Sequence, residues 1–314
     1  MSKNDFIVIG AGMAGLIAAS MLRGRLISVL EKQPALPDNH SAVLRFRSPV
    51  VSDATGIAFE KVKAIKEVDR WRNSIADALA YSTKVTGIGM MRSITDQMGT
   101  VERFVAPPDF LAQLESASNP KILYSWDDLL GTINRSQKEG FNIISTIPMP
   151  IMERVLWASD PEVEYRHRAG ANVVLTLGPS INGFATIYLP DPAIGAARLS
   201  LTRNVVSVEF YGSSRTDLEL TEEAFDLACD KLGVLGSLIN KVEVKQQPFA
   251  KILPIDEAYR RRTLVRMTDE FGIYSLGRYA TWRPGLLLDD LVKDVRQIVA
   301  MADSKDRYTH RLKG

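Results

Sequence analysis

Short apolar runs, separated by a turn and a helix-like segment, form the clearest pattern at the beginning of the chain. Phe6 to Ile9 is a continuous apolar run rich in β-branched residues, and Leu26 to Leu30 is a second apolar run. Runs of this length are typical of parallel strands that are buried on both faces. Between them, Met13 to Leu22 consists almost entirely of good helix formers. The pattern predicts a strand, a helix and a parallel strand.

Three glycines stand in the turn between the first strand and the helix. Gly10, Gly12 and Gly15 match the spacing G-x-G-x-x-G. The first glycine permits the tight turn, the second lets a pyrophosphate approach the backbone, and the third lets the helix pack closely on the strand. The first helical turn, which contains Met13 and Ala14, then points its N–H groups at the phosphates.

An acidic residue ends the second predicted strand. Glu31, which is followed by Lys32, lies 21 residues after Gly10. A carboxylate at about this distance binds the ribose hydroxyls in dinucleotide-binding folds. It favours NAD or FAD over NADP, because a carboxylate repels a 2′-phosphate. The sequence therefore predicts an adenine dinucleotide site.

The next segments carry weaker patterns. Arg45 and Arg47 lie in a short strand or loop, and their planar guanidinium groups suit a phosphate or carboxylate. A solvated basic strand explains the same two residues equally well. From Ile57 to Tyr81 the chain is charged, and its apolar residues are spaced for one face of a helix: Val62, Ile65, Val68 and Trp71. Short helices are predicted at Phe110 to Leu114 and at Trp126 to Leu130, the second with Ser125 as its N-cap.

A further buried strand is predicted near the middle of the chain. Phe141 to Ile147 is mostly apolar and stops at Pro148, which cannot continue a central strand. We expect this strand to belong to the same parallel sheet as Phe6 to Ile9. A helix is expected to begin near Pro150 and to continue through Met152 to Leu156.

The pattern changes after Glu162, where strands alternate with turns. The predicted strands are Val173 to Leu177, Ala185 to Leu189 and Arg198 to Phe210. Polar and apolar residues alternate from Arg198 to Arg203, as expected for an antiparallel sheet with one polar face. A helix is predicted to begin at Thr221. We expect this block, with part of Ile57 to Leu130, to form a substrate domain inserted into the nucleotide-binding domain.

The C-terminal part contains a second informative segment. An aliphatic and aromatic strand ends at Gly277 and Arg278. A helix is predicted from about Leu288 to Met301, with Asp289 and Asp290 in its first turn, where acids suit the helix dipole.

Composition and charge narrow the class of protein. The chain has 314 residues, 46% of them hydrophobic and 24% charged, which is typical of a soluble globular protein with one large domain or two. The net charge of +2 gives no reason to expect nucleic acid or an anionic membrane as a partner. Cys229 is the single cysteine, which excludes an internal disulfide and suits the reducing cytoplasm. No metal site or catalytic triad is evident around the three histidines, His40, His167 and His310.

Three segments together resemble a known superfamily. GAGMAG with Glu31, then NIISTIPMP, then GIYSLGRYATW with its following helix resemble the FAD-dependent superfamily that includes amine oxidases, protoporphyrinogen-oxidase-like proteins and UDP-galactopyranose mutase. The resemblance covers the whole chain. It lacks the Gly-Gly pair that usually follows the acidic residue, and the chain is short for the superfamily.

The resemblance implies a fold class, a cofactor and contact residues. The fold is α/β: a Rossmann-like FAD-binding domain of residues 1–50, 131–160 and 265–314, with a smaller inserted α+β substrate domain of residues 51–130 and 161–264 that contains an antiparallel sheet. The cofactor is FAD. Pro148 is expected close to FAD, Gly277 and Arg278 at the pyrophosphate, and the segment from Trp282 to Leu288, with Leu287, around the flavin.

The expected function is FAD-dependent dehydrogenation of a C–N or C–C bond by hydride transfer to the flavin, with an amine as substrate. Candidate catalytic residues are Lys251, Tyr279 and Trp282, although the two aromatics are equally well explained as core residues. Arg260 to Arg262 is interpreted as a solvated helix face.

Three alternatives remain open. One is a non-redox, mutase-like enzyme that acts on a nucleotide-sugar, for which the substrate region offers Arg166, Arg168, Arg198 and Arg203. The second is a flavoenzyme like those that bacteriophages use on an amine-bearing modified thymine in DNA. The third is a flavin-binding sensor without turnover. The substrate, the reoxidant and the oligomeric state are not determined by the sequence.

Overall fold

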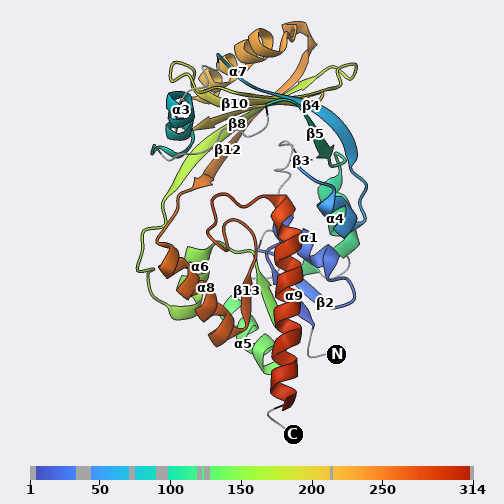
Figure 1. Cartoon of the computed structure of the whole chain (residues 1–314), viewed down its shortest axis with the longest axis vertical. Coiled ribbons are helices and arrows are strands. Elements are labelled where there is room, and N and C mark those ends of the chain that lie inside the picture. Colours follow the sequence, from blue (N-terminus) through green and yellow to red (C-terminus); the bar gives the residue numbers. More distant parts are fainter. Residues whose placement is uncertain are drawn as a thin grey trace.

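The computed structural model describes residues 5–32, 44–70, 75–89, 98–118, 122–123, 128–212 and 215–311. It contains two sheets at opposite ends of an elongated molecule (Figure 1). The first is a five-stranded sheet in the order β13-β7-β1-β2-β6, and all its neighbouring strands are parallel. Its strands are β1 (Phe6–Ile9), β2 (Leu26–Leu30), β6 (Ile122–Leu123), β7 (Asn142–Ser145) and β13 (Ile273–Ser275).

Helices cover both faces of the parallel sheet, because its central strands are apolar on both sides. One face packs against α1 (Met13–Met21), α2 (Val50–Thr55), α4 (Phe110–Ser118) and α9 (Leu288–Arg311). The other packs against α5 (Leu129–Glu139), α6 (Met149–Trp157) and α8 (Glu257–Phe271). Phe6, Val8 and Ile9 are fully buried between these layers. The three-layer arrangement confirms the predicted α/β class with a parallel sheet.

The second sheet has eight strands in the order β12-β8-β11-β10-β9-β4-β5-β3. The pairs are antiparallel except β4 with β9. The strands are β3 (Arg45–Phe46), β4 (Glu60–Val68), β5 (Gly99–Val105), β8 (His167–Leu177), β9 (Gly183–Tyr188), β10 (Ala196–Arg203), β11 (Val205–Tyr211) and β12 (Ile239–Ile252). A single 3₁₀ turn, η1 (Gly236–Leu238), precedes β12.

The two faces of the eight-stranded sheet differ in character. Helix α7 (Asp217–Leu232) covers an apolar face built from residues such as Val173, Leu199 and Val208. The other face turns towards the parallel-sheet part of the molecule, and α3 (Ile75–Thr86) packs on one side of it (Figure 1). This second face of the eight-stranded sheet therefore lies towards the parallel sheet (Figure 1).

The predicted helix in the range 57–81 is wrong in its first half. Glu60–Val68 is a strand, and its burial alternates at Val62 and Ala64 while Ile65 is 50% exposed. The lysines and glutamates of this segment occupy the exposed positions, so a strand period of two was mistaken for a helical stripe. Trp71 lies outside the described residues.

Three boundaries also differ from the prediction. The range 198–210 is two strands joined by a tight turn at Arg203, whose φ is +56°, rather than one strand. Helix α7 begins at Asp217, because Thr216 and Glu219 form a capping box before Thr221. Helix α5 is capped by Asp128, whereas Ser125 and Trp126 lie outside the described residues.

The chain passes between the two sheets several times, and the predicted domain boundaries stay a prediction. Within the range 51–130, β6 pairs with β2 and α4 packs on α1, so both belong to the parallel-sheet side. Among the described residues, no helix has both the length and the apolar character that are needed to cross a membrane.

Candidate functional site

The glycine turn has the tight packing that the sequence predicts. A Cβ added to Gly15 would overlap the carbonyl oxygen of Gly10, and one added to Gly10 would overlap Thr146 Oγ1. Gly10 also has φ +97°, a conformation that side chains rarely adopt. By contrast, a Cβ on Gly12 would meet nothing within 4 Å. The open side of the turn at Gly12 is therefore where a ligand can approach the backbone.

The first turn of α1 provides amide donors at this open side. Gly12 is the N-cap of α1, and no side chain caps the helix. The N–H groups at a helix N-terminus favour an anion such as a pyrophosphate. Met13 and Ala14 belong to this first turn, as predicted from the spacing.

The C-terminal Gly-Arg segment lies against the same helical turn. Gly277 has φ +93°, and a Cβ added there would lie 3.0 Å from the Ala14 side chain. The Arg278 guanidinium donates to the Leu286 carbonyl oxygen from Nη2 at 2.9 Å, which closes the loop between β13 and α9. Ala14 and Gly277, which are far apart in the sequence, therefore lie side by side at the N-terminus of α1.

Glu31 lies at the end of β2 with its carboxylate turned to the glycine loop. Its Oε2 accepts a 2.6 Å hydrogen bond from the Ala11 N–H, and its Oε1 accepts one from Lys32 N–H. The carboxylate is therefore within reach of the turn that a dinucleotide would occupy. This position fits the predicted ribose-binding role.

The strand end at Thr146 to Pro148 joins the glycine turn to the C-terminal loop. Thr146 Oγ1 donates to the Ile9 carbonyl oxygen at 3.0 Å. Pro148 caps α6, and the next residue, Met149, donates its N–H to the Tyr279 carbonyl oxygen at 3.0 Å. The structure thus brings together the three segments on which the sequence resemblance rests.

The N-terminus of α9 completes this side of the site. Asp289 Oδ1 accepts from the Ser48 N–H at 3.0 Å and from the Ser48 hydroxyl at 2.9 Å, and its Oδ2 accepts from the Arg47 N–H at 3.4 Å. Asp290 accepts the Leu287 N–H at 2.9 Å. Arg47 and the Leu287–Leu288 pair therefore lie at the same helix end, although they are distant in sequence.

Two candidate catalytic aromatics connect the C-terminal loop to β12. The Tyr279 hydroxyl donates to the Phe249 carbonyl oxygen at 2.5 Å, and the Trp282 indole N–H donates to the Leu253 carbonyl oxygen at 2.8 Å. Trp282 is only 3% exposed, and its ring makes an edge contact with Tyr165. Its φ of +46° is unusual for a bulky residue, and strain of this kind is held only where the surrounding structure fixes it.

A cavity of about 370 Å³ lies beside Trp282, between the C-terminal loop and the β12–α8 connection. Its lining residues are Pro254, Ile255, Glu257, Arg260, Trp282, Arg283, Pro284, Gly285, Leu286 and Asp290. Arg260, which was interpreted as part of a solvated helix face, donates to the Thr281 carbonyl oxygen at 3.0 Å and so supports the loop.

The face of the eight-stranded sheet that is not covered by α7 is rich in polar side chains. Adjacent strands place these side chains next to one another in register, and we call this set the polar face: Asn172, Thr186, Tyr188, Arg198, Ser200, Ser207, Glu209 and Tyr211. Asn172 and Ser207 form a buried 2.7 Å hydrogen bond. Polar groups cost free energy when they are buried without hydrogen-bond partners. A set of polar side chains gathered on one inward-facing surface is therefore typical of a binding site.

An ion pair stands at the centre of the polar face. Arg198 Nη2 pairs with Glu209 Oε1 across β10 and β11, and Tyr211 donates its hydroxyl to Glu209 Oε2 at 2.5 Å. Burial acts to raise the pKa of Glu209, but the adjacent Arg198 and Lys251 charges hold it at about 2. The Arg198 side chain remains 32% exposed, although its Nε atom is buried and has no hydrogen-bond partner among the described residues. Arg198 is therefore fixed by Glu209 and stays partly exposed.

Lys251 lies at the margin of the polar face. Its ammonium nitrogen is 5.0 Å from the centre of the Tyr211 ring, and its charge acts on Glu209. The structure thus places this candidate residue on the same side of the sheet as Glu209 and Tyr211, and its catalytic role stays a prediction.

Arg45 does not point to the glycine turn. Its Nη2 donates to the Ala185 carbonyl oxygen at 2.9 Å and to Thr186 Oγ1 at 2.5 Å, both on β9. Burial, and then the nearby Arg198 charge, lower the pKa of Arg45 from 12.5 to about 10. Arg45 therefore belongs to the polar face, and its predicted role at the cofactor stays a prediction.

The four arginines that the sequence offers for a diphosphate do not converge. Arg166 is half exposed beside Glu164, and Arg203 pairs with Glu60 at 3.0 Å. Arg168 donates to the carbonyl oxygens of Thr83 and Tyr211. Only Arg198 lies at the centre of the polar face.

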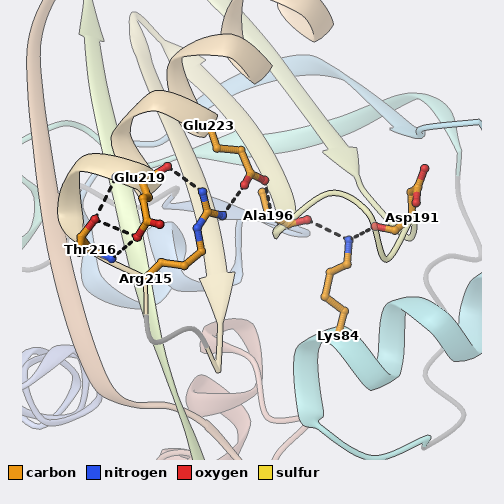
Figure 2. Close-up of polar contacts among 7 residues, drawn as sticks. All are labelled: Lys84, Asp191, Ala196, Arg215, Thr216, Glu219 and Glu223. Carbon is orange, nitrogen blue, oxygen red and sulfur yellow. Dashed lines mark hydrogen bonds and ion pairs between the residues drawn. The ribbon is translucent and has the colours of Figure 1, made fainter.

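A second polar network holds the β9–β10 connection in place between α3 and α7 (Figure 2). Lys84 donates its ammonium to the carbonyl oxygens of Leu189, Asp191 and Ala196. Glu223 of α7 accepts from the Ala196 N–H at 2.8 Å and from Arg215. This network ties the β9–β10 connection to both helices.

The polar face as a unit was not predicted from the sequence. The alternation at Arg198 to Arg203 predicted one polar side of a strand, but the pairing of Arg198 with Glu209 depends on a turn at Arg203 that was not recognised. The signal that was present is the second alternation at Ser207, Glu209 and Tyr211.

Comparison with solved structures identifies the fold. Reduced UDP-galactopyranose mutase is similar with a TM-score of 0.63 at 14% identity, over 95% of this chain and 93% of that chain. An oxidoreductase from Methanosarcina mazei has a TM-score of 0.54 at 10% identity, over 94% of this chain and 100% of that chain. p-Nitrophenol 4-monooxygenase from Pseudomonas putida has a TM-score of 0.56 at 11% identity, over 97% of this chain and 80% of that chain.

The fold is thus the one found in FAD-binding flavoproteins with Rossmann-type nucleotide sites. No family model and no curated protein sequence matches the chain. The fold similarity extends across the chain, and the particular activity is not determined by it.

Proposed function

We propose that this chain is an FAD-dependent enzyme that dehydrogenates a substrate bound on the polar face. The observation that carries the proposal is the convergence of Gly12, Ala14, Gly277 and Glu31 at one open helix N-terminus. Among cofactors with an adenosine diphosphate group, FAD is supported by the fold and by the C-terminal Gly-Arg segment that closes the site. When bound, the flavin supplies the redox chemistry by accepting a hydride.

The residues of the chain supply binding and orientation. The first turn of α1 would hold the pyrophosphate, Glu31 the ribose hydroxyls, and the loop from Arg278 to Leu288 the end of the cofactor that reacts. The polar face would orient the substrate opposite that loop, with Arg198 held in position by Glu209. The two layers together would exclude water from the reacting atoms.

The preferred reaction is oxidation of a C–N bond in an amine, with a C–C bond as the alternative. Lys251 and the hydroxyl groups of the polar face provide polar contacts for such a substrate. Anaerobic mixing of the FAD-loaded protein with a panel of amines should bleach the flavin absorption band. An unchanged band across a broad panel would exclude amine oxidation while leaving flavin binding intact.

A mutase-like reaction on a nucleotide-sugar is the second candidate. Two observations favour it: the similarity to UDP-galactopyranose mutase over almost the entire chain, and the position of Arg198 on the polar face. UDP-sugars added to the reduced protein should then change the flavin spectrum without net oxidation. The absence of any spectral change with UDP-sugars would remove this candidate.

A further inference from the structure

Two arginines of the eight-stranded sheet lie close together on the side of the polar face. Arg45 of β3 is directly opposite Val105 of β5, and Arg103 precedes Val105 by two residues. Residues two apart on a strand point to the same side, so Arg45 and Arg103 are diagonal neighbours. Arg103 in turn stands opposite Val62 of β4, the strand that pairs with β9. Because Arg45 reaches Thr186 of β9, both arginines face the same space as Arg198.

The acidic groups on β3, β5, β4, β9, β10 and β11, which are consecutive in the sheet, do not neutralise Arg45 and Arg103. On the same side of these strands, Glu60 pairs with Arg203 at 3.0 Å and Glu209 pairs with Arg198. Within the described part of the chain, neither Arg45 nor Arg103 makes an ion pair. Among the described residues, the hydrogen bond that Arg103 donates goes to the backbone carbonyl oxygen of Glu102 at 2.6 Å.

The positive charges in this space act on one another. The pKa of Arg103 is lowered by burial first and then by the Arg47 charge, while Asp289 and Tyr188 act in the opposite direction. Arg198 and Arg103 both lower the pKa of Arg45, in addition to its burial. Each guanidinium thus makes the charged form of its neighbours less favourable, and a bound anion would remove this cost.

We infer that the substrate carries a carboxylate or a phosphate group, which Arg45 and Arg103 bind beside Arg198. This inference rests on the proposed function, because it assigns the polar face to a substrate. A guanidinium binds either group through two parallel N–H donors. For the proposed amine oxidation, the substrate is then an amine that also bears an anionic group.

A role at the FAD phosphates is the competing explanation for these arginines. The hydrogen bonds of Arg45 are to β9 of the second sheet, whereas the glycine turn that suits a pyrophosphate belongs to the first sheet. Arg47, whose N–H is bonded to Asp289 at the end of α9, is better placed for the cofactor. The two explanations differ in whether bound FAD blocks the anion site.

Isothermal titration calorimetry at constant ionic strength, with inorganic phosphate and separately with acetate, distinguishes a substrate site from a role at the FAD phosphates. The FAD-loaded protein should bind at least one of the two anions, and Arg103→Gln should weaken that binding by about tenfold or more. Arg135→Gln removes an exposed arginine of α5, outside the eight-stranded sheet, and should leave the affinity unchanged. The stronger ligand of the two identifies the anionic group.

Three results would overturn the inference. The first is that neither the FAD-loaded nor the flavin-free protein binds an anion. The second is that FAD abolishes anion binding, and the third is that Arg103→Gln and Arg135→Gln weaken it equally. If the protein takes up no flavin, the proposed function fails. Loss of anion binding in Arg103→Gln of the flavin-free protein would then still support an anion site.

Discussion

Gly277 packs against Ala14, so the far end of the chain forms a wall of the helix N-terminus that the first glycines create. The added Cβ would lie 3.0 Å from the Ala14 side chain, and Gly277 has φ +93°. This contact converts a general dinucleotide turn into a site closed from both ends of the sequence. It also makes Gly277 sensitive to substitution for two independent reasons.

We expect Gly277→Ala to destabilise the protein by about 1–3 kcal/mol, because a side chain is unfavourable at this φ and crowds Ala14. FAD affinity should fall with it. Chemical denaturation measures the first effect and FAD titration the second. Gly285→Ala is the matched control in the same loop, since a Cβ there meets nothing within 4 Å. Equal effects of the two substitutions would contradict this explanation.

The Arg198–Glu209 pair allows a second prediction. Glu209→Gln should lower the free energy of unfolding by about 2–3 kcal/mol, because it leaves the Arg198 charge without its partner in a partly buried position. Glutamine keeps an acceptor for the Tyr211 hydroxyl, so the effect isolates the lost charge. Urea denaturation at neutral pH measures it.

Removing both charges of this pair should cost less than removing one. The double variant Arg198→Met with Glu209→Leu should be more stable than Glu209→Gln alone, because no unpaired charge remains. A double variant that is less stable than the single one would show that the pair is not held by its charges.

The acid dependence of stability follows from the same pair. The pKa of Glu209 in the folded protein is about 2, below its usual value of 4.5, so its contribution is present above pH 4.5. This contribution should be lost as the pH falls from 4.5 towards 2. Comparing the wild type with Glu209→Gln at a series of pH values isolates it from other carboxylates. A stability difference that stays constant down to pH 2 would contradict the assigned cause.

The burial of Lys84 should make the stability of the protein depend on pH in the alkaline range. Burial lowers the pKa of Lys84 from 10.5 to about 8, although Asp191 and Glu223 act to raise it. Because the folded protein releases this proton more easily than the unfolded one, folding becomes more favourable as the pH rises from 8 to 10.5. The stability of the wild type relative to Lys84→Met should therefore increase over this interval. A relative stability that falls from pH 8 to 10.5 would show that the ammonium is stabilised rather than strained by its three carbonyl partners.

Most of the nucleotide site could be predicted from the sequence, because neighbouring residues specify the turn, the strand end and the helix start that form it. The Gly10–Gly15 turn, the strand β7 that precedes Pro148 and the helix that begins at Leu288 were all predicted and lie together. Each depends on turn geometry, a proline stop or a helix start that neighbouring residues specify.

The polar face could not be assembled in the same way. Its residues come from β8, β9, β10 and β11, β4 lies beside β9, and the order of these strands in the sheet is decided by long-range pairing. Lysines and glutamates in β4 concealed its strand period, and the turn at Arg203 contains no glycine to mark it. Which arginines meet a carboxylate, and which do not, follows from that pairing and not from local sequence.

The most direct test of the account compares FAD binding by the wild type and by Gly12→Ala. A Cβ at Gly12 meets no protein atom within 4 Å, so the variant should keep the unfolding temperature of the flavin-free wild type. The same Cβ would occupy the open side of the turn and should weaken FAD binding by at least about tenfold. The wild type should be yellow, with flavin absorption bands, or should become so on titration with FAD. A colourless wild type that takes up no FAD, or a Gly12→Ala variant that binds FAD equally well, would contradict the assigned site.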